Sequence, residues 1–237
     1  MQHIDPASLQ DLPSRIRYLR DFIEFTHEDA AALRAAKPIV APLVPTVVDM
    51  VYAKLFSFDI TANAFLPRQT GYAGEVPMRL EDLTHDHPMI KFRKDFLSGY
   101  LVKLVSMDYE KDSSWEYLDK VGLMHTGAAG FAHRAKKPGL RVEYMHCAIL
   151  LGYVEEILIA TITAHLDLDL EAKQAVLRAF NKIIWIQNDL FARHYIPDAE
   201  ILARKVTLDK TTALAVATGL LCLGAAFATY MMPRLQS

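Results

Sequence analysis

The sequence predicts an all-α fold. Between residues 14 and 194, apolar side chains recur every three or four positions, the spacing that places them on one face of a helix. No run of alternating apolar and polar residues requires a β-strand, and no internal repeat is present. Ten glycines and eleven prolines in 237 residues are too few for a loop-rich or disordered chain.

The overall composition excludes some classes of protein. A net charge of −2 gives no electrostatic footprint for nucleic acid. Cys147 and Cys222 lie far apart in apolar surroundings and match neither a zinc site nor a disulfide framework, which favours a reducing compartment. The first residues lack a basic region followed by an apolar run, so we expect no secretory signal.

The first third of the chain predicts three helices. Residues 14–24 form a short amphipathic pattern, and Thr26 is a typical N-cap for a second helix over residues 28–37. Prolines at 38, 42 and 45 then predict a kink or a new helix start before the apolar helix at residues 46–56.

Residues 57–88 are expected to be mostly irregular because proline and glycine interrupt them repeatedly. The H-D-H-P sequence at residues 85–88 could be taken for a metal site, but a solvated turn is the better interpretation. Residues 89–107 form a strong amphipathic helix in which Phe92, Phe96 and Tyr100 fall one turn apart. This aromatic stripe suits either the core or the wall of an apolar pocket.

His125 is the main candidate for chemistry. Residues 115–131 are predicted to be one helix, with His125 on a face of small apolar residues that would leave flat space for a planar ligand: Leu118, Val121, Gly122, Ala128, Ala129 and Ala132. Imidazole is the commonest metal-binding side chain. The alternative is a core histidine bonded to a backbone carbonyl. Two long helices follow, over residues 140–165 and 170–194.

The C-terminal tail predicts a membrane span. Residues 211–232 contain no charged side chain, and a helix of this length would reach roughly 33 Å, about the thickness of the hydrocarbon core. Basic residues at 204, 205 and 210 would keep the preceding domain on the cytosolic side. We therefore expect a domain over residues 1–197, a linker over 198–210 and a tail anchor. The alternative is a cytoplasmic protein with a buried C-terminal helix.

Three stretches resemble the protoglobins and the globin domains of globin-coupled sensors. F-T-H-E-D at residues 25–29 looks like the start of the family's first main helix. V-V-D-M-V-Y at residues 47–52 is similar to the distal helix, with Val51 where the family often has an aromatic residue. V-G-L-M-H at residues 121–125 looks like the motif that ends in the proximal histidine. The resemblance covers roughly residues 14–197.

The resemblance implies a globin-like fold with an extra N-terminal helix and a haem (iron protoporphyrin IX) bound by His125, to which the uncharged tail adds a hydrophobic C-terminal helix. The second ring nitrogen of His125 would donate to a carbonyl near Val121, and Gly122 would let the porphyrin edge approach the backbone. Tyr52 would hydrogen-bond a gas molecule on the iron. The haem-binding residues expected on this basis are His125, Tyr52, Val51, Phe92, Phe96, Val121 and Gly122.

Three functions remain open on the sequence. The first is reversible binding of O2, CO or NO by a membrane-anchored gas sensor or carrier. The second is a haem enzyme acting on nitric oxide or nitrite, which would need an external reductase because no G-x-G-x-x-G motif is present. The third is a helical bundle without a cofactor. The resemblance also implies a homodimer formed through the two long helices.

Overall fold

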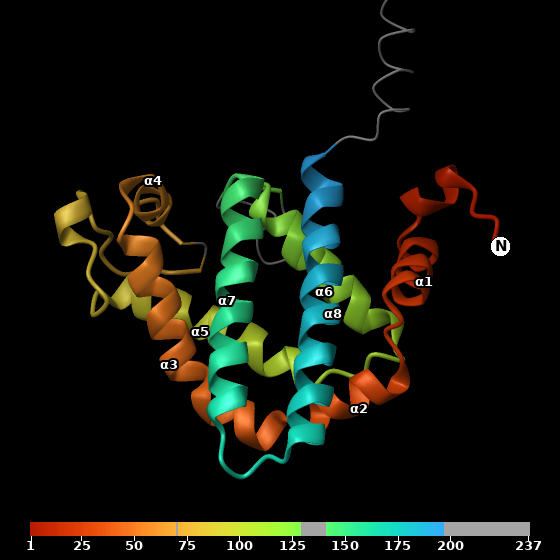
Figure 1. Ribbon diagram of the computed structural model, residues 1–237. Helices are drawn as coiled ribbons and strands as arrows, with labels where there is room; N and C mark the ends of the chain where they lie inside the picture. Colours follow the sequence, from red (N-terminus) through yellow and green to blue (C-terminus); the bar gives the residue numbers. More distant parts are fainter. Residues whose placement is uncertain (70, 129–140, 197–237) are drawn as a thin grey trace, which may run out of the picture. The chain divides into compact units, whose positions relative to one another are not determined.

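The computed structural model describes residues 1–69, 71–128 and 141–196, and almost all of the regular structure in them is helical (Figure 1). The α-helices are α1 (Leu12–Ile23), α2 (His27–Ala35), α3 (Lys37–Phe56), α4 (Asp59–Ala62), α5 (Pro88–Leu104), α6 (Asp112–His125), α7 (Tyr144–Ala164) and α8 (Leu170–Tyr195). Short 3-10 turns lie at Pro6–Gln10 (η1), Asn63–Phe65 (η2) and Leu80–Asp82 (η3). One isolated β-bridge pairs Thr126 with Arg141. The all-α prediction is confirmed.

The first helices begin at side-chain caps. Asp11 caps α1, where its carboxylate accepts a 3.1 Å hydrogen bond from the Ser14 amide. Thr26 caps α2 as predicted, accepting a 3.2 Å bond from the Glu28 amide, while its own amide donates to Asp29 at 2.9 Å. This reciprocal arrangement is a capping box, which satisfies amide groups that a helix start leaves unpaired.

Helix α3 begins earlier than the sequence predicts, at Lys37 rather than at residue 46. Pro38 occupies the first turn, where a missing amide hydrogen costs nothing. Pro42 and Pro45 lie inside the helix and remove internal hydrogen bonds. The opposing gain is burial: one face of α3 is packed in the core from Val40 to Tyr52. Tertiary packing therefore overrides the local signal of the prolines.

The segment between α3 and α5 is largely irregular, as predicted, apart from α4, η2 and η3. His87 in its H-D-H-P sequence caps α5, because its Nδ1 accepts a hydrogen bond from the Met89 amide at 3.1 Å. No cluster of potential metal ligands occurs in the described parts of the chain. The H-D-H-P sequence is thus a helix start.

Helix α6 is shorter at its C-terminal end than predicted. It ends at His125, and Gly127 has a φ of 89°, a left-handed conformation that stops the helix. Ala128 therefore does not extend the face that carries His125, and this part of the prediction is wrong. The residues at 129 and 132 lie outside the described residues.

Helices α7 and α8 lie side by side and α8 forms much of the core (Figure 1). Gln187 is a buried polar residue of α8 whose amide donates to the Leu118 carbonyl at 3.2 Å and accepts from the Tyr100 hydroxyl at 3.2 Å. It thereby joins α8 to α6 and α5. Met1–Tyr195 form one compact unit. The predicted linker at 198–210 and membrane span at 211–232 lie outside the described residues.

Candidate functional site

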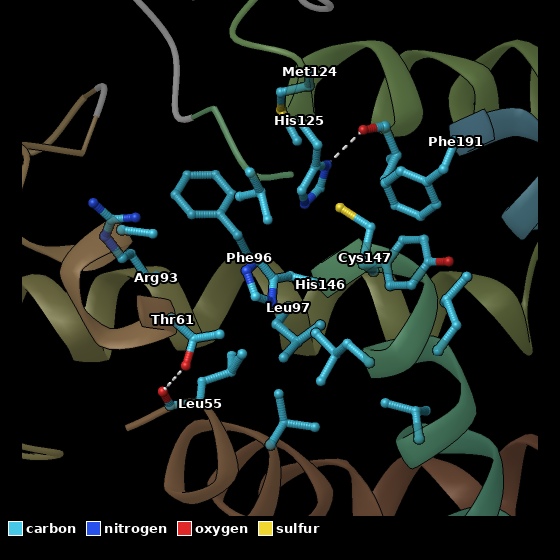
Figure 2. Close-up of a pocket in the computed structure, with 18 of the residues that line it drawn as sticks. Leu55, Thr61, Arg93, Phe96, Leu97, Met124, His125, His146, Cys147 and Phe191 are labelled. Carbon is cyan, nitrogen blue, oxygen red and sulfur yellow. Dashed lines mark hydrogen bonds between the residues drawn. The ribbon is translucent and has the colours of Figure 1, made fainter. Parts of the chain in front are cut away.

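A cavity of about 540 Å³ lies between α3, α5, α6, α7 and α8 (Figure 2). This volume falls within the range of roughly 300–1,000 Å³ typical of small-molecule sites. Most of the lining is aliphatic or aromatic, with a small number of polar side chains. An apolar chamber with few polar groups suits a large, flat, mostly apolar ligand.

His125 is the last residue of α6 and lines this cavity. Its Nδ1 lies 2.7 Å from the Val121 carbonyl, one turn earlier, which is the hydrogen bond that the sequence predicts (Figure 2). Because a carbonyl can only accept, Nδ1 carries the hydrogen and the ring lone pair is on Nε2. The Phe191 ring of α8 packs edge-on against the imidazole at 5.0 Å. These contacts fix the ring's orientation and its tautomer.

The first two residues of the V-G-L-M-H motif, Val121 and Gly122, face different neighbours. Val121 is buried and lines the cavity. Gly122 does not line it: a Cβ at this position would clash with the Leu190 carbonyl of α8. The predicted role of Gly122 beside the porphyrin edge is therefore wrong. One residue along a helix is a turn of about 100°, so Gly122 faces α8 where Val121 faces the cavity.

Tyr52 and Val51 reach the cavity from α3. Tyr52 is only 4% exposed, and its ring packs against Phe65 and Phe56 at 5.4 and 5.8 Å between centroids. Its hydroxyl makes no hydrogen bond to any described residue. Burial raises the pKa of Tyr52 well above its ordinary value, so the hydroxyl remains a hydrogen-bond donor. A buried hydroxyl that donates to no described residue can donate a hydrogen bond to a polar ligand.

The aromatic stripe of α5 divides between two environments. Phe96 lines the cavity and is partly open to solvent, so it lies at the cavity's edge. Phe92 does not line the cavity; its ring packs against Tyr72 at 5.6 Å and against Phe96 at 5.0 Å. Phe92 therefore supports Phe96 from behind, and its predicted place in the pocket wall is wrong. The loop that carries Tyr72 could not be placed from sequence.

The lining includes polar residues that were not predicted, among them Gln69, Arg93, His146 and Cys147. Figure 2 shows His146 and Cys147 of α7 beside the same cavity as His125. Burial raises the pKa of the Cys147 thiol to about 11, so it stays protonated at neutral pH. Nothing in the sequence near these residues forms a motif. Arg93, His146 and Cys147 are single polar residues within helical patterns, and Gln69 lies in the loop after η2, so their sequence context alone does not mark them.

Residues 12–200 match the protoglobin family. The fold is similar to the globin domain of Geobacter sulfurreducens globin-coupled sensor, with a TM-score of 0.57 and 19% identity over 76% of this chain and 97% of that chain. This likeness establishes a shared globin-like fold. A comparison with curated proteins found no similar sequence. Because the family match spans most of its length, the chain belongs to the protoglobin family.

Proposed function

We propose that the chain binds haem in this cavity through His125 and binds a diatomic gas reversibly, as a sensor or a carrier. Membership of a globin family implies haem binding. The identity of the iron ligand and the class of bound molecule are our proposal. The residues of the cavity support it on three physical grounds.

The observation that carries the proposal is the state of His125. A single histidine is a standard haem ligand, and the ligating nitrogen must be unprotonated. The bond from Nδ1 to the Val121 carbonyl at 2.7 Å leaves the lone pair on Nε2. The same bond increases the basicity of the imidazole, as outer hydrogen bonds to metal-binding histidines do.

The rest of the cavity fits a haem and a small ligand. Its apolar lining, which includes Val51, Val121 and Phe96, would exclude water from the porphyrin faces. A bound haem supplies an iron atom with a position open to a gas molecule. Tyr52 would donate a hydrogen bond to that molecule, a contribution of about 1 kcal/mol. The role of Phe92 would be to hold Phe96 in place.

The test is an absorption spectrum of the full chain purified with haem supplied, beside His125→Ala and a control, His165→Ala. His165 lies at the end of α7 and does not line the cavity. We expect a Soret band that shifts under carbon monoxide in the wild type and the control, and that is lost or altered in His125→Ala. A chain that takes up no haem would overturn the proposal.

We also propose that residues 211–232 anchor the chain in a membrane. The support is their length and lack of charge. Two described helices, α3 and α7, also have the length and composition of a membrane span, but core helices of globular proteins meet the same criteria. The full chain should float with lipid vesicles, and Leu221→Glu with Leu223→Glu should abolish flotation. Equal flotation of both chains would contradict the anchor.

Dimerisation through α7 is a further part of the proposal. Along α7, an exposed stripe at three- and four-residue spacing includes Met145, Ile149 and Ile159. Gly152 and Glu156 lie between Ile149 and Ile159 in this stripe, and the three large apolar side chains beside them are of the kind that a partner usually covers. A second copy of the chain would cover this stripe.

A further inference from the structure

The cavity has a charged end as well as an apolar body. Arg93 of α5 lines it and is only 5% exposed. The other charged lining residues in the described parts of the chain, Arg141 and Glu143, are exposed and pair with each other at 3.4 Å. Arg93 is therefore the buried charged side chain among the described lining residues.

Arg93 and Tyr52 belong to the same corner of the cavity. The Arg93 guanidinium carbon lies 5.2 Å from the Phe65 ring centroid, and the Tyr52 ring packs on the same phenylalanine at 5.4 Å. One Arg93 amine donates to the Pro67 carbonyl at 2.7 Å, which holds the guanidinium there. The positive charge is near enough to Tyr52 to oppose the rise that burial causes in the pKa of its hydroxyl.

Gln69 adds a third polar group to this corner. It is 6% exposed, lines the cavity and lies two residues after the Pro67 carbonyl that Arg93 binds. A guanidinium, a phenol and a carboxamide all offer hydrogen-bond donors. A guanidinium in an apolar chamber is costly to desolvate, and an anion beside it offsets that cost. A neutral gas needs no such charge.

We propose that Arg93, assisted by Tyr52 and Gln69, makes this corner a receptor for small monoanionic haem ligands such as azide or nitrite. The inference rests on the proposed haem binding and names a ligand class beyond neutral gases. Arg93 selects for ligand charge, and Tyr52 donates to the ligand whatever its charge.

The test is a spectroscopic titration of the haem-loaded full chain with azide in the ferric state and with carbon monoxide in the ferrous state. In Arg93→Gln we expect azide affinity to fall about tenfold or more, the effect of losing a hydrogen bond between charged groups. Carbon monoxide affinity should change less than about threefold because that ligand is neutral. Arg93→Lys, which keeps the charge, should recover part of the azide affinity.

The control is Lys94→Gln. Lys94 is the next residue of α5 and lies 5.7 Å from the Tyr52 ring centroid, but it pairs with Asp49 at 2.7 Å and does not line the cavity. Its loss should leave azide affinity within about threefold of the wild type if direct contact, rather than net charge, is responsible.

Three outcomes would overturn the inference. Unchanged azide affinity in Arg93→Gln, with normal carbon monoxide binding, would remove it and leave the proposed function intact. Equal losses in Arg93→Gln and Lys94→Gln would reduce it to a general effect of charge. Faster haem loss with unchanged azide affinity would show that Arg93 binds a haem carboxylate instead. A chain without a Soret band would remove the proposed function itself.

Discussion

At the scale of single residues, Gly122 marks a close approach between α6 and α8. A Cβ there would lie 3.0 Å from the Leu190 carbonyl carbon and closer still to its oxygen, and 3.3 Å from Cδ2 of His194. Backbone atoms cannot move aside as the end of a flexible side chain can. The glycine therefore sets the spacing of α6 against α8, and with it the position of His125.

Gly122→Ala should destabilise the fold by about 1–3 kcal/mol through overpacking. The measurement is denaturant unfolding followed by circular dichroism. Gly99→Ala is the matched control, since Gly99 also lies in a helix but a Cβ there meets nothing within 4 Å. The control should gain about 0.5–1 kcal/mol from the lower backbone entropy of alanine. A neutral Gly122→Ala would contradict the close approach.

At the scale of elements, α7 carries the surface that a partner would cover. Ile149 lies in the exposed stripe defined above and is 69% exposed. Its neighbours Met145 and Ile159 extend the apolar surface along the helix. Burial of such side chains is worth about 1.5–3 kcal/mol each.

Ile149→Glu should weaken a dimer formed through α7, because it would bury a carboxylate in an apolar interface. Light scattering over a range of concentrations checks this, with a dimer expected for the wild type and a monomer for the variant. Phe22→Glu is the control, since Phe22 is 78% exposed but belongs to α1 and does not line the cavity. A wild-type chain that is monomeric at high concentration would contradict the proposed dimer.

At the scale of the whole molecule, buried tyrosines connect stability to alkaline pH. Burial raises the pKa of Tyr52, Tyr100 and Tyr109 well above the ordinary value near 10. Above that value the unfolded chain releases protons that the folded chain retains. The free energy of unfolding should therefore be unaffected by these groups below about pH 10 and should fall as the pH rises further.

Each of the three tyrosines should remove about 1.4 kcal/mol of stability per pH unit above 10. Denaturant unfolding between pH 8 and 11 measures the slope. Tyr52→Phe should reduce the slope by one tyrosine's share, and Tyr18→Phe, at a residue outside the core, serves as the control. A flat profile to pH 11 would contradict the effect of burial.

The helical class, the order of the helices and two of the cavity's lining residues, His125 and Tyr52, could be predicted from the sequence. The spacing of apolar residues is a local property, so it was sufficient for α1, α2, α5, α7 and α8. The resemblance of V-V-D-M-V-Y and V-G-L-M-H to protoglobin motifs pointed to Tyr52 and His125, and both residues line the cavity. The bond from His125 to the Val121 carbonyl follows from helical spacing alone.

Features that depend on contacts between distant segments could not be predicted from the sequence. The start of α3 depends on packing that outweighs two prolines, and the place of Gly122 depends on the Leu190 carbonyl of another helix. Phe92 lies outside the pocket because its ring packs against Tyr72, which belongs to a loop. Arg93 enters the cavity for a related reason, since the Pro67 carbonyl and the Phe65 ring hold its guanidinium there. Periodicity assigns a side chain to a face, but the neighbour on that face is set by how the helices and loops assemble.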